Sequence, residues 1–365
     1  MDETLHIRGA LLPGGEERDL FVDAGTITFE SMSDARTILD GGYLLPGLVD
    51  AHAHLPFAGP APDGTWEEKA RANARAHLEA GVLAVRDPGG PTPNDIGPRE
   101  GLPRTSVAGR FLAAPGRMFP EHGQRELPEE QIPDAAEEEL RYSRSWVKLI
   151  GDFPGPEGRM VPSFRPETLA ETARRVHAGG GRITIHAFLD QTIDAAIEAR
   201  FDAIEHGVML RPDQAAAMAK QGMAYVPTVS GLENWPQILG MFQAPAEEVE
   251  RIAEAIRRHP ETVRKAWEAG VAVLAGTDAG LVDHGLVRNE VAALIGAGIP
   301  ADVALGAASW AARSFLGLPS IEEGGFADLV AYDRNPLEDP AVLESPNLIL
   351  LDGRVVRSPS MNTTE

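Results

Sequence analysis

The sequence contains no cysteine, which excludes disulfide bonds, a thiolate nucleophile and a cysteine-ligated zinc site. An excess of basic residues is also missing, because the 365-residue chain has a formal net charge of -22. Nucleic acid and anionic membranes both require a basic surface on their partner. No apolar stretch is long enough to span a membrane, and the N-terminus lacks the basic region and apolar run of a signal peptide. We therefore expect a cytoplasmic protein, capable of forming a homo-oligomer, whose partner is a small-molecule substrate.

Lysine is scarce, and arginine supplies most of the positive charge. The four lysines are Lys69, Lys148, Lys220 and Lys265. Three of them lie in polar, helix-like surroundings, whereas Lys148 lies within the apolar segment Trp146–Ile150. A buried ammonium is costly unless it is paired or neutralised. Either Lys148 reaches the surface or a carboxylate, or a depressed pKa leaves a neutral amine that reacts with carbon dioxide. The second alternative gives a carbamate, which can bridge two metal ions.

The middle of the chain alternates helix, glycine and apolar strand. A helix is predicted over residues 65–80, and others begin near residues 166, 212 and 245, each followed by glycine. Eight strands are predicted near residues 46, 83, 106, 147, 184, 203, 225 and 273. Such alternation indicates an α/β fold with a parallel sheet buried on both faces. Because polar residues fall at or near the carboxyl ends of the strands, we favour a (β/α)8 TIM barrel over a doubly wound sheet.

Both ends of the chain are rich in short strands and turns. We expect residues 1–45 and 322–357 to combine into a small β-sandwich, with the barrel over residues 46–321. The polar residues 358–365 are expected to form a frayed tail.

Candidate metal ligands follow several of the predicted strands. In an extended segment His52 and His54 point to the same side, which gives half of a metal site; an exposed turn or a hydrogen-bonded pair is the alternative. His186, His206 and Asp278 close later strands, although alone each histidine fits a core and Asp278 fits a helix cap or turn. Together with Lys148 they form a nitrogen and oxygen ligand set suited to two divalent ions, of which we favour zinc.

At this point the sequence resembles a known family, the metal-dependent amidohydrolase superfamily. The similarity is greatest to the branch that includes imidazolonepropionase and prolidase-like dipeptidases with a carboxylated lysine. It spans nearly the whole chain and is carried by Pro46–His54, Val147–Leu149, Ile185–Ala187, Glu205–Gly207, Gly276–Asp278 and Gly325–Val330.

The resemblance implies a role for each ligand. One metal is held by His52, His54 and Asp278, and the other by His186 and His206. A carboxylated Lys148 and a hydroxide bridge the two ions, and Asp278 moves the hydroxide's proton to the leaving group. The implied reaction is hydrolysis of an amide-type C–N bond in a dipeptide, an N-acyl amino acid or a cyclic amide. A lactonase or arylesterase using the same site is the alternative, and a non-catalytic barrel is disfavoured because all six ligands are present.

Four further residues are candidates for substrate binding. His122 lies in a Pro-, Gly- and Glu-rich connection over residues 113–142, which we expect to be an irregular loop over the active site. His284 and Arg288 follow Asp278 and can bind a carboxylate, and Tyr225 ends the seventh strand. The alternatives are an exposed loop for His122, a surface salt bridge for Arg288 and core packing for Tyr225. Thr228, Asn234 and Trp235 follow Tyr225 and are further pocket candidates.

One position departs from the family pattern. Phe188 follows the His186-Ala187 pair, at a place where the residue varies among relatives. This leaves the predicted metal site intact, and the substrate has to be inferred from the loops.

Overall fold

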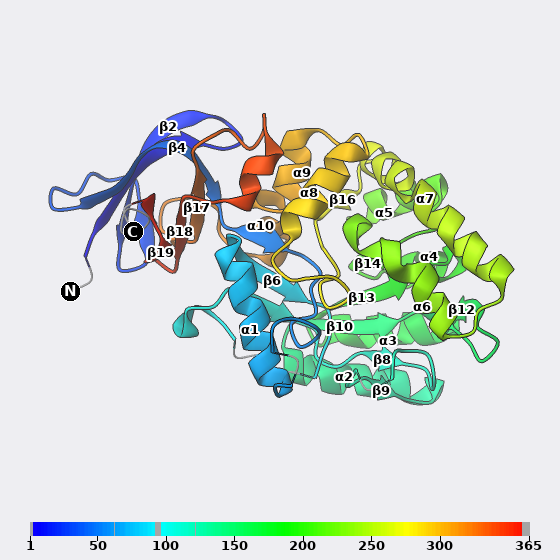
Figure 1. Cartoon of the computed structure of the whole chain (residues 1–365). Helices are drawn as coiled ribbons and strands as arrows, with labels where there is room; N and C mark the ends of the chain where they lie inside the picture. The colour runs from blue at the N-terminus through cyan, green and yellow to red at the C-terminus, as the bar shows by residue number, and fades with distance from the viewer. Residues whose placement is uncertain (1–2, 62, 92–95, 121, 360–365) are drawn as a thin grey trace.

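The computed structural model describes residues 3–61, 63–91, 96–120 and 122–359. Figure 1 shows a sheet built from both ends of the chain beside a larger α/β unit that contains the parallel strands and the helices. Within the described ranges, no helix is both long enough and apolar enough to cross a membrane.

Parallel strands form two sheets in the larger unit. One sheet has the order β5-β6-β7, and the other has the order β16-β15-β14-β13-β10-β8-β9. The eight predicted strands are therefore present, and most of them are buried, as β6, β10 and β14 are along their whole length. Their bounds are β5 Leu48–Asp50, β6 Val82–Asp87, β7 Arg104–Val107, β8 Leu112–Ala113, β9 Arg125–Glu126, β10 Trp146–Ile150, β13 Arg182–Ala187, β14 Ala203–His206, β15 Ala224–Val226 and β16 Ala272–Val273. A short hairpin, β11 Asp152–Pro154 and β12 Met160–Pro162, follows β10.

Backbone hydrogen bonds also join the free edge of β5 to the chain just after β16. Ala51 N donates to Ala275 O over 2.8 Å, and Asp278 N donates to His52 O over 2.8 Å. These bonds bring the first and last strands of the unit side by side. As a result, His52 and Asp278, which are more than 200 residues apart in the sequence, lie at one place.

Helices follow the parallel strands in alternation, and local signals in the sequence set their limits. Thr65 caps α1 in a capping box with Glu68, and Gly81, with φ of +79°, follows the helix. The helix bounds are α1 Trp66–Glu79, α2 Ile132–Ser143, α3 Pro166–Ala178, α4 Asp190–Glu198, α5 Pro212–Gln221, α6 Trp235–Met241, α7 Ala246–Glu268, α8 Val287–Gly296, α9 Ala301–Ala307 and α10 Trp310–Leu316.

The connection over residues 113–142 differs from the sequence-based expectation of one irregular loop. Its second half is the regular helix α2, whose residues Ile132, Ala136 and Leu140 are buried on one face. This spacing of four residues is the helical repeat, which the high content of proline and glutamate obscured. The part that remains irregular, residues 114–120 and 122–124, carries His122.

The two ends of the chain form a single mixed sheet of seven strands, in the order β19-β18-β17-β4-β1-β2-β3. Strands from both ends share one core, which includes Leu5, Leu20, Leu329 and Leu348. The strands from both ends therefore belong to one sheet, where the sequence suggested a β-sandwich of two sheets. The bounds are β1 Leu5–Leu11, β2 Glu16–Asp23, β3 Thr26–Thr28, β4 Arg36–Pro46, β17 Leu329–Tyr332, β18 Leu348–Leu351 and β19 Arg354–Arg357.

The boundary between this sheet and the parallel strands differs slightly from the prediction. The single strand expected around Leu45–Val49 is divided at Gly47, because β4 ends at Pro46 and β5 begins at Leu48. The expected domain limits stay a prediction. Of the tail at 358–365, residues 360–365 lie outside the described ranges, while Ser358 is buried.

Asp328 connects the terminal sheet to the larger unit. Its carboxylate is buried and accepts hydrogen bonds from Arg104 Nε (2.6 Å) and Arg313 Nη2 (3.3 Å), and its carbonyl accepts one from Gly47 N (2.9 Å). The arginines come from β7 and α10, so the ion pairs cross from one unit to the other. The motif Gly325–Val330 thus has a structural role at the junction.

Candidate metal centre

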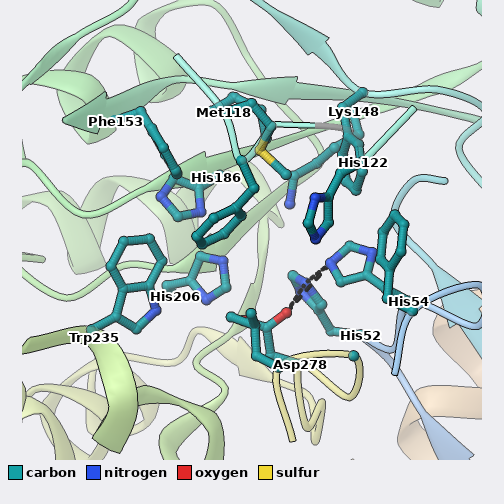
Figure 2. Close-up of a pocket in the computed structure, with 16 residues that line it drawn as sticks. His52, His54, Met118, His122, Lys148, Phe153, His186, His206, Trp235 and Asp278 are labelled. Atoms are coloured by element: carbon teal, nitrogen blue, oxygen red, sulfur yellow. Dashed lines mark hydrogen bonds and ion pairs between the residues drawn. The ribbon is translucent and has the colours of Figure 1, made fainter. Parts of the chain in front are cut away.

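The predicted metal ligands gather at the carboxyl ends of the parallel strands. His186 and His206 lie at or next to the ends of β13 and β14, and Lys148 lies in β10. His52 and His54 follow directly after β5. Asp278, which follows β16, joins them across the hydrogen bonds between the first and last strands. All six side chains line one cavity (Figure 2).

Two histidines and the aspartate are close enough to share a cation. His52 Nε2 lies 3.2 Å from His54 Nε2 and 3.2 Å from Asp278 Oδ1, and His54 Nε2 lies 3.4 Å from the same oxygen (Figure 2). One ligand atom from each of His52, His206 and Asp278 lies within 4.8 Å of the others. The ring of His186 is centred 4.5 Å from that of His206, which extends the cluster beyond this group.

Hydrogen bonds on the outer side of the rings orient the lone pairs inward. His52 Nδ1 donates to Glu205 Oε2 over 2.7 Å, and His54 Nδ1 donates to the carbonyl of Gly89 over 2.9 Å. In the neutral form both rings present Nε2 lone pairs 3.2 Å apart, which repel unless a cation lies between them. Burial alone would lower the pKa of His54, but the carboxylates of Asp278 and Asp87 raise it to about 9, so this ring has to lose a proton when a metal ion binds. This arrangement fits a divalent metal ion, because ligating histidines characteristically donate their other N–H to a carboxylate or carbonyl.

Burial favours the neutral form of the other two histidines, His186 and His206. Burial lowers the pKa of His186 and of His206 well below the ordinary value, and the neighbouring Lys148 acts in the same direction. His206 Nδ1 lies 2.8 Å from Thr228 Oγ1, which can accept its hydrogen. His186 Nε2 has no hydrogen-bond partner in the described part of the chain and lies 3.7 Å from Asp152 Oδ1. Neutral imidazoles are the form that binds metal.

Lys148 is buried, and its ammonium has no hydrogen bond or ion pair with the residues that the structure describes. Burial lowers the pKa of Lys148 to about 8, although the carboxylate of Glu205 partly offsets the effect. The alternative of a lysine that reaches the surface does not agree with this position. A lysine with a lowered pKa has a neutral fraction near pH 7, which is the form able to react with carbon dioxide.

Asp278 and His206 adopt a backbone conformation that residues other than glycine rarely adopt. Their φ angles are +57° and +67°, in the left-handed region. Such conformations cost roughly 1–3 kcal/mol each and concentrate at functional sites. Burial alone would raise the pKa of Asp278, but the imidazole of His52 holds it well below the ordinary value. Asp278 is therefore an ionised carboxylate that can bind metal or accept a proton.

Sequence reasoning did not identify Glu205 as part of the site. Its buried carboxylate accepts hydrogen bonds from His52 and from Arg86 Nη2 (2.8 Å), and Thr184 donates a further one. Arg86 packs over the ring of Trp146, with its guanidinium carbon 4.2 Å from the ring centroid. A signal in the sequence could have identified both residues: Glu205 and Arg86, like Lys148, are charged residues inside an apolar strand.

Three of the predicted substrate-binding residues lie away from the cavity. Tyr225 is buried in the core and donates to His206 O over 2.9 Å. His284 is hydrogen-bonded to His77 and to the carbonyl of Phe57. Arg288 is nearest to Glu344, at 3.6 Å, in a surface ion pair. The alternatives of core packing for Tyr225 and a salt bridge for Arg288 thus agree with the structure, and none of the three residues lines the cavity.

His122 does lie at the cavity, together with a set of aromatic rings. Its ring is centred 4.6 Å from Phe57 and 5.3 Å from Phe119. Figure 2 shows His122 above His52 and His54, with Phe153 and Trp235 across the cavity. Of the other pocket candidates, Trp235 lines the cavity, whereas Thr228 contacts His206 from behind and Asn234 is not among the lining residues. Phe188 stacks against His186 at 5.0 Å.

The fold and the metal centre together define a family of hydrolases, and comparison with known proteins agrees. The chain belongs to the amidohydrolase family, whose model matches residues 43–356, and it is a metal-dependent amidohydrolase. It is 39% identical to an uncharacterized protein of Mycobacterium tuberculosis over 354 residues, which covers 96% of this chain and 95% of that protein. It is 24% identical to the ochratoxinase of Aspergillus niger, covering 84% of this chain and 73% of that protein.

A solved structure of a Xaa-Pro dipeptidase shares the fold. It superposes with a TM-score of 0.82 at 24% sequence identity, over 98% of this chain and 100% of the dipeptidase. At this level of identity the likeness shows the fold and leaves the substrate open.

Proposed function

We propose that the protein is a binuclear metal-dependent hydrolase that cleaves an amide-type C–N bond. The observation that carries this proposal is the convergence of inward-facing imidazole nitrogens, the Asp278 carboxylate and the buried amine of Lys148 on one cavity. We assign His52, His54 and Asp278 to one ion, and His186 and His206 to the second. Carboxylated Lys148 would bridge them, and zinc is the cation we favour for this ligand set.

The fold proposed for this function is a closed (β/α)8 barrel. Its support is the pair of hydrogen bonds that join the chain after β5 to the chain after β16, beside the two sheets of parallel strands. Closure matters for the chemistry because it brings His52 next to Asp278.

The chain's own residues supply positioning and proton transfer. When bound, the two ions activate a water molecule and polarise the scissile carbonyl. Asp278 accepts the proton that the water loses as its oxygen adds to the carbonyl carbon. The C–N bond then breaks, and Asp278 returns the proton to the leaving nitrogen, giving a carboxylic acid and an amine. Glu205 and the Gly89 carbonyl keep His52 and His54 in the orientation that binds metal.

Ester or lactone hydrolysis is a second candidate. The same site would attack an ester carbonyl, and among the described residues that line the cavity there is no arginine to bind the carboxylate of a peptide or amino acid. The names of the similar proteins, a Xaa-Pro dipeptidase and an ochratoxinase, lead us to place amides first.

The test combines metal analysis with a substrate panel. Wild type, Lys148→Ala and a matched control, Lys265→Ala, are purified without chelator, and metal per chain is measured beside hydrolysis of amides, esters and lactones. Lys265 is a half-exposed helix residue paired with Glu261, so the control removes a lysine without touching the site. We expect close to two metals per chain and activity in wild type and control, and a loss of both in Lys148→Ala. Equal metal content and activity in all three proteins would contradict the bridging role.

A further inference from the structure

The cavity beside the metal ligands has an aromatic wall. We use this term for Phe57, Phe111, Phe119, Phe153 and Trp235, all of which line the cavity. Their rings contact one another across the space: Phe119 is centred 5.3 Å from Phe153, and Phe57 is centred 6.2 Å from Phe111. The rings come from four separate parts of the sequence, because Phe111 and Phe119 belong to the same stretch of chain. Their gathering at one place therefore reflects the fold rather than one apolar run.

Positive charge is missing from this wall. Among the described residues that line the cavity, Lys148 is the single lysine and arginine is absent. Arg117 precedes the lining residue Met118, but its guanidinium donates to the carbonyl of Phe153 and lies outside the lining. The polar groups near the rings are the imidazole of His122 and the indole N–H of Trp235, which has no hydrogen-bond partner in the described part of the chain.

The cost of an anionic substrate in such a cavity is high. A carboxylate that is desolvated against aromatic carbon without a cationic partner loses its hydration and gains no ion pair. The formal charge of -22 on the chain adds a long-range repulsion to any anion that approaches. Uncharged molecules meet neither penalty.

The space also limits the size of the substrate. The empty volume between the walls, mouth included, is about 480 Å³. This volume lies in the lower half of the range of ligand pockets and favours a small substrate over one with two large groups.

We propose that the substrate is a small uncharged amide or ester whose single aromatic ring packs against the aromatic wall while its carbonyl faces the metal ligands. This inference rests on the proposed hydrolase function, and it selects uncharged aromatic compounds over dipeptides and N-acyl amino acids. Ring-on-ring contacts with Phe153 and Trp235 supply the recognition.

The first test compares two amides that differ by one carboxylate. N-acetyl-2-phenylethylamine and N-acetyl-L-phenylalanine share the ring and the scissile bond, and kcat/KM is measured for each with zinc-loaded protein. This ratio is unaffected by non-productive binding of the carboxylate to the metal ions. We expect kcat/KM to be at least about 10-fold higher for the uncharged compound, which corresponds to about 1.4 kcal/mol. Equal values, or a preference for the carboxylate, would overturn the inference.

Variants then locate the cause of the preference. Met118→Arg places a cation on the cavity lining and is expected to shift the ratio toward N-acetyl-L-phenylalanine. Met241→Arg adds the same charge on α6, where Met241 is 75% exposed and outside the lining, and should leave the ratio unchanged. Arg117→Gln should also leave it unchanged. If Arg117→Gln selectively lowers kcat/KM for the carboxylate, Arg117 recognises it and the inference is wrong.

Binding measurements separate this inference from the proposed function. N-acetyl-2-phenylethylamine is titrated calorimetrically into zinc-loaded wild type and Trp235→Ala. One outcome is millimolar or tighter binding to wild type that Trp235→Ala weakens, with no hydrolysis of any substrate. This outcome keeps the inference and overturns the proposed function. Hydrolysis that favours carboxylated substrates keeps the function and overturns the inference. Absence of both binding and hydrolysis overturns both.

Discussion

Glu205 lies behind the metal-site histidines and joins three side chains from different strands. It receives hydrogen bonds from His52, Arg86 and Thr184, and Arg86 and His52 hold its pKa well below the ordinary value against the effect of burial. Because the carboxylate fixes the tautomer of His52, its charge supports a lone pair on the metal side of the ring. The role of Glu205 is therefore positioning, and its loss should alter metal binding before it alters the chemistry.

We predict that Glu205→Gln weakens metal binding by roughly 10–100-fold. It should also lower the free energy of unfolding by about 3–5 kcal/mol, because Arg86 is left as a buried charge without its partner. Competition with a chromogenic chelator measures the first effect, and urea unfolding of the metal-free protein measures the second. Glu198→Gln is the matched control, since Glu198 is exposed at the end of α4. Unchanged metal affinity in Glu205→Gln would show that the hydrogen bond to His52 does not orient the ligand.

His259 offers a second residue-scale test, away from the metal ligands. Its ring is buried, Nε2 donates to the carbonyl of Pro227 over 2.9 Å, and burial lowers the pKa to about 4. In the unfolded chain the pKa is near 6.5, so the unfolded state binds more protons in the interval between the two values. The contribution of neutral His259 to the free energy of unfolding is therefore fully present above pH 6.5 and falls by about 3 kcal/mol as the pH drops to 4.

The measurement is urea unfolding of wild type and His259→Gln between pH 4 and pH 7.5. Glutamine can still donate to the Pro227 carbonyl but does not titrate. We expect the stability of the variant to fall less steeply than that of wild type below pH 6.5, while other buried histidines such as His77 contribute equally to both proteins. Parallel curves would mean that His259 keeps an ordinary pKa in the folded protein.

At the scale of elements, helix α8 supports the turn that carries Trp235. Glu290 of α8 is buried and accepts hydrogen bonds from Val229 N (2.9 Å) and Ser230 N (2.8 Å), at the start of the 3-10 turn over residues 229–234. The turn begins after Thr228, which contacts His206, and ends at Trp235 of the aromatic wall. The carboxylate of Glu290 thus supports both Thr228, the hydrogen-bond partner of the proposed ligand His206, and Trp235 of the aromatic wall.

We predict that Glu290→Ala raises KM more than it lowers kcat. The two freed N–H groups destabilise the turn by roughly 1–3 kcal/mol each where they are buried, and Trp235 loses its fixed place. Steady-state kinetics with an aromatic amide and hydrogen exchange over residues 228–235 measure these effects. Glu261→Ala, on the outer face of α7, controls for the loss of a carboxylate. Faster exchange in the turn without any change in KM would separate the turn from substrate binding.

A feature could be predicted from the sequence where its signal lies within one short segment of the chain. Helices and strands were predictable because apolar periodicity, capping residues and glycines act within one segment, as at Thr65 and Gly81. The gathering of the six candidate metal ligands was predictable because each one lies in or shortly after a strand, and the carboxyl ends of parallel strands meet at one edge. The roles of Glu205 and Arg86 were not, because their pairing joins strands 119 residues apart.

The substrate side of the cavity was the least predictable part. His284 and Arg288 follow Asp278 closely in sequence, yet the chain turns away from the cavity and both side chains find other partners. The aromatic wall comes from loops, the short strand β11 and the start of α6, whose positions depend on packing rather than on a repeat in the sequence. One element was also missed, since the helical repeat of α2 was masked by the composition of the segment before it.

At the scale of the whole molecule, the terminal sheet and the α/β unit are joined through the buried carboxylate of Asp328. Arg104 and Arg313 converge on it from the α/β unit, while its backbone leads directly into β17 of the terminal sheet. Removing the charge would leave the buried Arg313 without its counterion and Arg104 with Asp352 alone. Such a loss is strongly destabilising, because the desolvation of the arginines is no longer compensated.

We predict that Asp328→Asn lowers the free energy of unfolding by about 3–5 kcal/mol and does so equally in metal-loaded and metal-free protein. The loss of stability should be equal in both forms because Asp328 lies away from the site: it contacts β7, α10 and Gly47, and none of the proposed metal ligands. Thermal and urea unfolding, each with and without chelator, measure both parts of the prediction. Asp339→Asn, which removes an exposed pairing with Arg334, serves as the control and should change stability by less than about 0.5 kcal/mol. If Asp328→Asn instead lowers metal content, the junction transmits strain to the metal centre, and the terminal sheet contributes to the site as well as to the fold.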